Sequence, residues 1–247
     1  MMKSLVLACR EVMPAVLKLK KDLKNKASKK QADIMQRFFK TQPGQYGSGD
    51  VFLGVKVPQI RKIVKKYFFL EEKEILSLLY SKIHEERLAA LLIMIDRFEK
   101  GREAEKKRIF RLYLKNIGQV NSWDLVDISS PKIIGYYLLN RSKKPLYRLA
   151  CSDNLWQKRT ALVATIYFIK QDKFEDALKI IDMLLYDEHD LIQKAAGWML
   201  REIGKRDLNI EENFLKKRYK VMPRTALRYA IEKFPENKRK KYLYGKA

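Results

Sequence analysis

The chain has 247 residues, of which 53 are Lys or Arg and 29 are Asp or Glu, and its formal net charge is +24. This excess predicts binding to a phosphate backbone through counterion release, with an anionic membrane surface as the competing partner. The basic residues are spread along the chain and not gathered in one amphipathic segment, which favours nucleic acid. The longest apolar run, residues 160–169, is about half of a membrane span, so no spanning segment is expected.

The composition predicts an all-α protein, because only 10 Gly and 7 Pro interrupt stretches rich in Leu, Ile, Lys, Glu and Ala. In chain order, helices are predicted at residues 5–24, 29–40, 58–68, 72–80, 87–98, 103–116, from 123, from 131, and at 153–169, 174–186, 190–204, 211–219, 224–234 and 236–244. Ser122, Ser152 and Ser130, the last followed by Pro131, are predicted N-caps. No segment indicates a strand, and the residues 41–50, rich in Gly, predict a loop.

A basic residue precedes small and apolar residues four times along the chain. These basic residues are Arg87, Arg159, Lys194 and Arg224, separated by 72, 35 and 30 residues, and Trp123 lies halfway between the first two. A repeat of roughly 35 residues is typical of a HEAT-like helix pair in an α-solenoid, whose concave groove the basic residues would line. One domain is therefore expected over residues 1–247, with N-terminal helices and the loop in 1–50 and the repeat stack in 51–247.

Trp123 and Asp127 would lie one turn apart on one face of the helix that follows Ser122. An indole beside an isolated carboxylate, in so basic a chain, suggests a site that meets a polyanion and stabilises a cation. The alternative is a Trp in the core and an Asp in solvent.

Arg159 shares a helical stripe with Leu155, Leu162 and Ile166, where a charged side chain needs a partner or a place at the rim. Arginine grips phosphate with two parallel hydrogen bonds, which favours a DNA contact. An ion pair with a neighbouring helix is the equal alternative.

A second stripe is basic and consists of Lys194, Gly197, Arg201 and Lys205, with Trp198 at its margin. It could face DNA, or it could be a solvated face next to a core Trp. Glycine inside a helix costs stability relative to alanine, so Gly197 suggests close approach of a backbone or a ligand.

Metal binding, disulfides and secretion have little support in the sequence. His84 and His189 are the only histidines and have no cluster of ligands around them, so no metal is expected. Cys9 and Cys151 are expected to be reduced thiols in a cytoplasmic protein. Arg10 ends the first apolar patch too early for a signal peptide.

Four segments carry a resemblance to a known family. They are Ser-Trp-Asp-Leu-Val-Asp at 122–127, Ser-Asp-Asn-Leu-Trp-Gln-Lys-Arg at 152–159, Lys-Ala-Ala-Gly-Trp-Met-Leu-Arg-Glu at 194–202 and Phe-Leu-Gly-Val-Lys-Val-Pro at 52–58. In this order and spacing they resemble the DNA alkylation repair family of AlkD-type DNA glycosylases, and the likeness runs over residues 35–244. The resemblance implies an all-α stack of HEAT-like repeats wrapped around duplex DNA.

The reaction implied by the resemblance is hydrolysis of the N-glycosidic bond of a purine alkylated at N3 or N7. Such a base is a cation and leaves without a general acid, while the sugar gains oxocarbenium character. Asp127 would stabilise that charge and orient water, Trp123 and Trp198 would pack against the sugar and backbone, and Arg159 would hold a flanking phosphate. The family is expected to act without extruding the base, which contrasts with many other glycosylases.

The residues expected to contact DNA are Arg159, Lys158, Lys194, Arg201, Lys205, Arg224 and Phe38. The resemblance implies an aromatic near the lesion, which would be Phe38 or Phe39. No cofactor, metal or membrane is expected, and a monomer associated with the nucleoid is predicted. The loop at residues 42–50 is longer than in the best-known family members and could contact a groove or link helices. Two other functions stay open, namely non-catalytic recognition of duplex or branched DNA and a scaffold with a protein partner in the groove.

Overall fold

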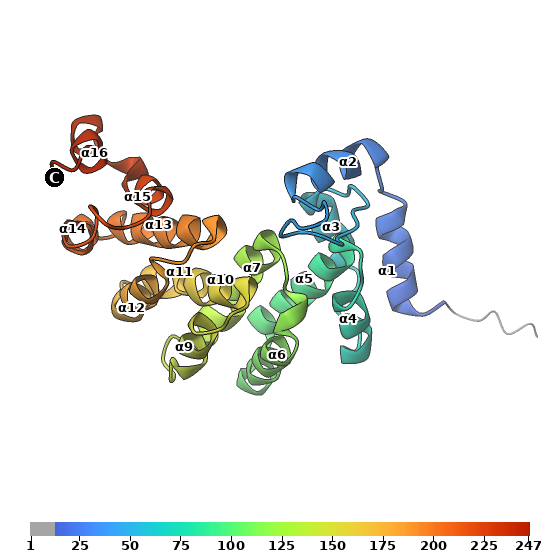
Figure 1. Cartoon of the computed structure of the whole chain (residues 1–247). Coiled ribbons are helices and arrows are strands. Elements are labelled where there is room, and N and C mark those ends of the chain that lie inside the picture. Colours follow the sequence, from blue (N-terminus) through green and yellow to red (C-terminus); the bar gives the residue numbers. More distant parts are fainter. Residues whose placement is uncertain (1–12) are drawn as a thin grey trace, which may run out of the picture. The chain divides into compact units, whose positions relative to one another are not determined.

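The computed structural model describes residues 13–247 and consists of helices joined by short connections (Figure 1). Within this described range no strand occurs, and the only bridge of β type joins Val51 to Ile83. The all-α prediction is confirmed. The chain divides into two compact units, Met1–Ile93 and Met94–Ala247, the first described from residue 13. The expectation of a single domain remains a prediction.

The described part of the first unit, residues 13–93, contains four helices and the beginning of a fifth. They are α1 (Ala15–Lys24), α2 (Lys29–Phe38), α3 (Val57–Val64), α4 (Glu72–Leu79) and α5 (His84–Lys100), which continues into the second unit. The predicted helix at residues 5–24 begins outside the described residues, and its described part starts after Pro14. Each of the other predicted helices in this unit lies within a few residues of its expected bounds.

The loop predicted at residues 41–50 is confirmed, and carboxylates fasten both it and the segment after it to α5. Asp50 binds Arg87 Nη2 through both oxygens at 2.7 Å and lies 3.0 Å from His84 Nδ1. Glu85 accepts hydrogen bonds from three consecutive backbone N–H groups of residues 53–55. The Arg87 side chain is only 4% exposed, so the expectation that it lines a surface is wrong. The Arg87 guanidinium is instead paired with the Asp50 carboxylate inside the fold, because a buried charge needs a partner of opposite sign.

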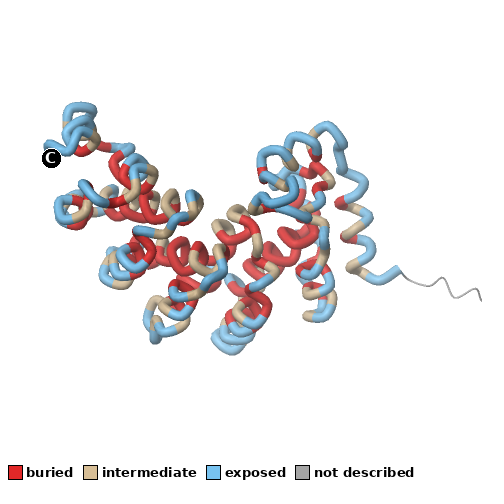
Figure 2. Tube along the Cα trace, in the orientation of Figure 1, coloured by how far each residue is buried: buried red, intermediate tan, exposed pale blue. Residues whose placement is uncertain are grey.

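The second unit contains the remaining helices. They are α6 (Glu103–Lys115), η1 (Ile117–Gln119), α7 (Trp123–Ser130), η2 (Pro131–Gly135), α8 (Tyr136–Leu138), α9 (Lys144–Ala150), α10 (Leu155–Ala164), α11 (Ile166–Ile169), α12 (Glu175–Leu184), α13 (Asp190–Gly204), α14 (Leu208–Lys216), α15 (Arg224–Ala230), η3 (Ile231–Lys233) and α16 (Glu236–Leu243). Figure 1 shows α10 between α7 and α13, in agreement with its contacts to both helices. Figure 2 shows α10 and α13 largely buried, and they form the core of this unit.

Two predicted helix starts in this unit are wrong. Pro131 does not begin a new helix, because α7 continues through it as a widened π turn and then into α8. Proline lacks an N–H group, and a π turn accommodates the missing hydrogen bond within one continuous helix. Asn154, and not Ser152, caps α10, since its side-chain oxygen accepts from the N–H groups of Trp156 and Gln157. Helix α9, which has only seven residues, was not predicted.

A close helix crossing occurs twice in the second unit with the same spacing. The first joins Gly135 to Ala164 and Tyr167, and the second joins Gly197 to Ala226 and Tyr229, each residue 62 positions after its counterpart. A methyl group on either glycine would lie 2.3 Å from the alanine carbonyl oxygen. The close approach predicted for Gly197 is thus one of backbone. The same register relates Lys-Ile-Ile-Gly-Tyr-Tyr-Leu at 132–138 to Lys-Ala-Ala-Gly-Trp-Met-Leu at 194–200.

Candidate functional site

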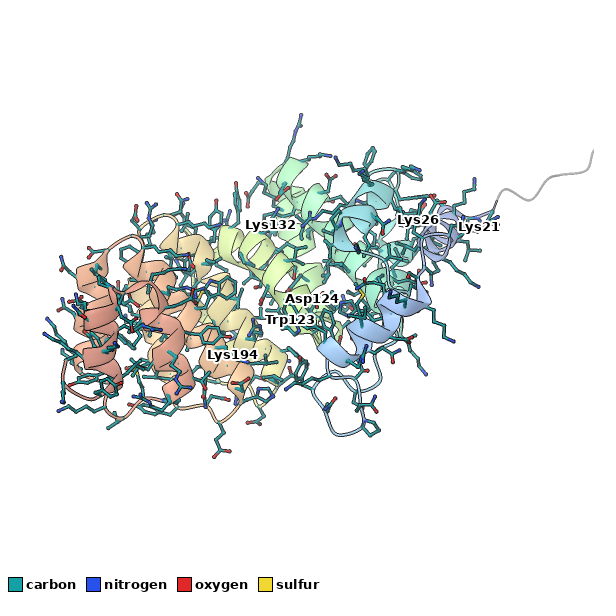
Figure 3. The ribbon with its side chains drawn as sticks, turned by 90° about the horizontal axis from the view of Figure 1, so that it is seen from above. Lys21, Lys26, Trp123, Asp124, Lys132 and Lys194 are labelled. Carbon is teal, nitrogen blue, oxygen red and sulfur yellow. The ribbon has the colours of Figure 1, made fainter. Side chains whose placement is uncertain are left out.

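Helix α7 places Trp123 at its first residue and Asp127 one turn later, as predicted. Figure 3 labels Trp123 and Asp124 at this helix start. Ser122 occupies the N-cap position, but its hydroxyl donates to Asp124 Oδ1 at 2.8 Å and does not accept from the backbone. The predicted cap is therefore replaced by a carboxylate in the first helical turn, where the partial positive charge of the helix end favours an acid.

Asp127 and Arg159 form a bidentate ion pair between α7 and α10. Nε of Arg159 lies 2.9 Å from Asp127 Oδ1, and Nη2 lies 2.8 Å from Oδ2. Nη1 donates to the Leu191 carbonyl of α13 at 2.7 Å. The arginine side chain is 7% exposed and the aspartate 21%. The structure thus contains the interhelical ion pair considered for Arg159, and it leaves the carboxylate within reach of solvent.

The electrostatics of Asp127 reflect burial opposed by its partner. Desolvation raises the pKa of Asp127, the Arg159 guanidinium counteracts this, and the nearby Asp124 adds to the rise. Each carboxylate oxygen accepts one hydrogen bond from Arg159 and has a second lone pair available. A paired yet accessible carboxylate can therefore act on a positive charge outside the protein.

A buried pair of hydroxyl groups joins α6 to α7, the helix that carries Asp127. The Tyr113 hydroxyl lies 2.9 Å from Ser129 Oγ, which donates to the Leu125 carbonyl within α7. Burial raises the pKa of Tyr113, and the Asp127 charge contributes to the same shift. The tyrosine is therefore a neutral anchor for the helix that carries Asp127.

The three tryptophans have different environments. Trp156 is 8% exposed and belongs to the core, whereas Trp123 and Trp198 are half-buried. The indole N–H of Trp198 donates to Glu202 Oε1 at 3.1 Å, and Lys205 binds the same oxygen at 2.7 Å. Trp198 stands seven residues after Leu191 on α13, about 10 Å along the helix axis. Neither tryptophan of the candidate site is thus a core residue.

The other cations predicted to contact DNA are each bound by an acceptor of the chain. The pairs are Lys158 with Asp187, Lys194 with Asp190, Arg201 with Glu232, Lys205 with Glu202, and Arg224 with the Leu243 carbonyl. The four ion pairs partly neutralise their cations. The alternative of a solvated face next to a core Trp does not hold for Trp198, which is half-buried, and contact of these cations with DNA stays a prediction. Phe38 is 64% exposed on the first unit, and its contact with a lesion stays a prediction.

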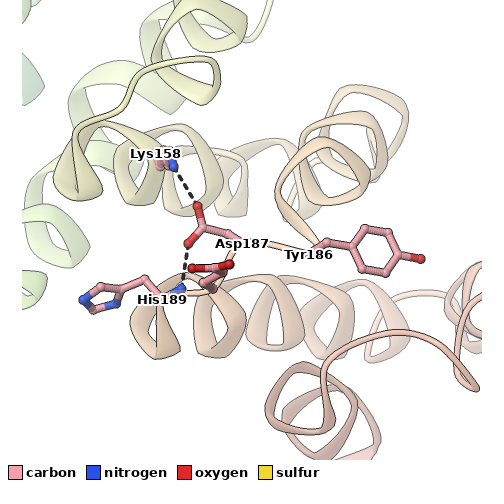
Figure 4. A pocket seen from close by; sticks show the side chains of 5 residues that line it. Lys158, Tyr186, Asp187 and His189 are labelled. Carbon is pink, nitrogen blue, oxygen red and sulfur yellow. Dashed lines mark hydrogen bonds and ion pairs between the residues drawn. The ribbon is translucent and has the colours of Figure 1, made fainter.

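A pocket of about 590 Å³ lies beside the ion pair and was not predicted (Figure 4). Its lining consists of Lys158, Tyr186, Asp187, Glu188 and His189. Asp187 binds the lysine at 2.8 Å and accepts from the His189 N–H, while His189 Nδ1 accepts from the N–H of Leu191. The imidazole therefore caps α13 next to the carbonyl that binds Arg159. Polar residues just before a helix are the sequence signal that could have revealed this cap.

Between residues 13 and 247 no group of three potential metal ligands occurs. Cys151 is exposed and free, while Cys9 lies outside the described residues. None of the described helices combines the length and apolar character needed to cross a membrane.

Comparison with known proteins agrees with these observations. The fold is similar to a predicted DNA alkylation repair enzyme from Enterococcus faecalis (TM-score 0.65, 18% identity, 85% of this chain and 98% of that one). It is also similar to AlkD2 from Streptococcus mutans (TM-score 0.53, 18% identity, 90% and 97% coverage). No curated protein matches the chain. The family model described as DNA alkylation repair enzyme matches residues 19–234, so the chain belongs to the family of DNA alkylation repair enzymes.

Proposed function

We propose that the protein is a DNA glycosylase that removes cationic N3- or N7-alkylated purines from duplex DNA. The observation that carries this proposal is the Asp127 carboxylate, held by Arg159 and still 21% exposed, one helical turn from Trp123. Membership of a DNA alkylation repair family supplies DNA as the polymer that meets this acid. In the proposed complex a monomer with HEAT-like helix pairs holds the duplex.

The reaction needs stabilisation of a cation more than it needs an acid. The bond from C1′ to the purine nitrogen breaks with its electron pair going to the base, which becomes neutral. The sugar becomes an oxocarbenium ion that the Asp127 carboxylate stabilises. Water then adds to C1′, and its proton passes to Asp127 and on to solvent. Because the charge develops in the sugar and not in the base, the base can remain stacked.

The tryptophans and Arg159 have supporting roles in this proposal. Half-exposed indoles of Trp123 and Trp198 can pack against the cationic sugar and the backbone. Arginine has five N–H donors, of which Arg159 uses three on Asp127 and Leu191. Two donors are left for a phosphate next to the lesion. One guanidinium can thus position the carboxylate and bind DNA.

The test is release of free base from duplex DNA treated with a methylating agent, followed by chromatography of 3-methyladenine and 7-methylguanine. Asp127→Asn keeps the shape and removes the charge, so release should fall by about 10²-fold or more. Duplex affinity should stay unchanged or tighten slightly, because a negative charge facing phosphates is lost. Asp153→Asn, which makes the same substitution at an exposed aspartate outside the helices, is the matched control and should keep the wild-type rate. Excision by Asp127→Asn at the wild-type rate would rule out this mechanism.

The second candidate is a DNA-binding protein of the same family without catalysis. Its supporting observation is that both oxygens of Asp127 are already bound to Arg159, as in an ion pair that only joins helices. This function predicts duplex or branched DNA binding with no release of base. The Asp127→Asn variant would then lose stability and binding together.

A further inference from the structure

Six lysines of the first unit form a surface that we call the α1–α2 corner. They are Lys18, Lys21, Lys24, Lys26, Lys29 and Lys30, and all six are exposed. Figure 3 places Lys21 on α1 and Lys26 on the turn that follows it. Within residues 13–247 no carboxylate lies at ion-pair distance from any of the six. The sequence interpretation, which treated basic residues as evenly spread, passed over this local concentration.

The few acids of this segment do not neutralise the corner. Asp22 accepts a hydrogen bond from the Tyr67 hydroxyl at 2.9 Å and is directed to the body of the unit. Among contacts within residues 13–247, Lys20 is the one lysine of α1 with an ion pair; it binds Glu86 at 2.9 Å and is not part of the corner. Asp33 stands one turn after Lys29 but forms no ion pair with it among the described contacts.

The N-terminal end of α2 adds to the positive charge of the corner, whereas Lys21 and Lys24 lie in the last turn of α1, where the helix end carries a partial negative charge. Lys29 and Lys30 occupy the first turn of α2, which contains no acidic residue, and there the helix itself carries a partial positive charge. Cations at this end repel that charge and lower the stability of the helix. An external anion would remove the repulsion. The arrangement is thus unfavourable in the free protein and favourable in a complex with a polyanion.

The corner contrasts with the residues around the candidate site. There, the cations Lys158, Lys194, Arg201 and Lys205 are bound by carboxylates of the chain, so phosphate must displace a partner. The corner lysines can bind phosphate without breaking an ion pair to any of residues 13–247. Lysines bind phosphates as point charges and read no base edge, so the contact would be independent of sequence.

We infer that the α1–α2 corner is a second DNA-binding surface, which holds backbone phosphates of duplex DNA outside the lesion site. The inference rests on the proposed function, since it takes DNA to be the partner. A lipid surface fits less well, because the apolar residues Leu19 and Leu23 of α1 are fully buried in the first unit. Leu17 is the one large apolar side chain that the described helix α1 exposes, and a single leucine does not form an apolar face that could insert into a bilayer.

The test compares two triple variants on an unmodified duplex over a range of salt concentrations. The corner variant carries Lys21→Gln, Lys24→Gln and Lys26→Gln. The control carries Lys73→Gln, Lys100→Gln and Lys179→Gln, which removes the same charge from exposed lysines that already bind acids. Glutamine is a good helix former, and circular dichroism verifies that both variants fold.

Each phosphate contact contributes about 0.9 to the slope of log K against log salt, so the corner variant should have a slope smaller by about 2.7. Between 50 and 200 mM salt the wild type should then lose roughly 40-fold more affinity than the variant. The control should keep the wild-type slope. Equal slopes for the corner variant and the wild type, or an equal loss in the control, overturn the inference.

Vesicle binding and release of alkylpurine distinguish the DNA-binding corner from a lipid-binding surface and from failure of the proposed function. Vesicles of phosphatidylcholine and phosphatidylserine test the lipid surface, and a variant that loses vesicle binding while its DNA slope is unchanged overturns the inference in favour of lipid. The proposed function fails if the wild type releases no alkylpurine. That assay is independent of the salt slope, so the two failures can be told apart.

Discussion

The buried carboxyl group of Glu211 on α14 leads us to expect that the stability of the protein falls as the pH rises from 6 to about 8. Its side chain is buried, with the residue 2% exposed, and its carboxyl group lies against Gly204, with Oε1 lacking a hydrogen-bond partner within residues 13–247. Burial raises the pKa of Glu211 from 4.5 to about 8, although Arg201 and Lys238 act in the opposite direction. The folded protein therefore holds a proton at this carboxyl that the unfolded chain has already released at pH 7.

The raised pKa fixes both the sign and the window of the effect. The contribution of the protonated Glu211 carboxyl group to the free energy of unfolding is fully present below about pH 4.5, the pKa in the unfolded chain. It is lost as the pH rises through about 8, the pKa in the folded protein. Each pKa unit corresponds to about 1.4 kcal/mol, so the difference between the unfolded and folded pKa of Glu211 corresponds to about 5 kcal/mol of unfolding free energy. Between pH 6 and pH 8 the free energy of unfolding should fall by about 2 kcal/mol.

Urea denaturation at constant salt, followed by circular dichroism at several pH values from 6 to 8, measures this loss. Glu211→Gln carries no titrating group, so its free energy of unfolding should change much less across the same range. Glu236→Gln is the control, because Glu236 is exposed and its pKa is lowered by Arg239. Equal pH dependence in the wild type and in Glu211→Gln would refute the assignment of the proton to Glu211.

Two further predictions concern packing and the ion pair. Gly135→Ala and Gly197→Ala should each destabilise the protein by about 1–3 kcal/mol, because the added methyl would lie 2.3 Å from a carbonyl oxygen. Gly118→Ala, where nothing lies within 4 Å, should be neutral or stabilising in the same denaturation assay. Arg159→Ala should cost about 3 kcal/mol by leaving the partly buried Asp127 unpaired, and equal thermal stability of variant and wild type would contradict this.

The fold was predictable where local signals and burial agree. Helix α13 has the bounds expected from the sequence, Asp190–Gly204, because its apolar positions recur at helical spacing between polar ends. The π turn at Pro131 was not predictable from the local proline rule. Ile133, Ile134 and Gly135 are all buried there, and their packing keeps the helix continuous despite the missing N–H group. The local sequence is compatible both with a new helix at Pro131 and with one continuous helix, and tertiary packing selects the continuous helix.

The candidate site was predictable in its residues but not in its pairings. Helical spacing placed Trp123 and Asp127 on one face, and the apolar stripe around Arg159 indicated that this arginine needed a partner. Nothing local indicated which acid it would be, since Asp127 is 32 residues away in the sequence. The cap by His189 was missed for a related reason, because an imidazole accepts from a backbone N–H only when the chain turns in the right place.

The contact of Arg159 with both Asp127 and the Leu191 carbonyl has a consequence for folding cooperativity. The three groups belong to α7, α10 and α13, so the geometry of the carboxylate depends on helices drawn from residues 123–204. No shorter piece of the chain contains the whole arrangement. Local unfolding of α13 would release the guanidinium and disorder the acid 64 residues earlier in the chain. The site therefore persists only as long as this whole block remains folded.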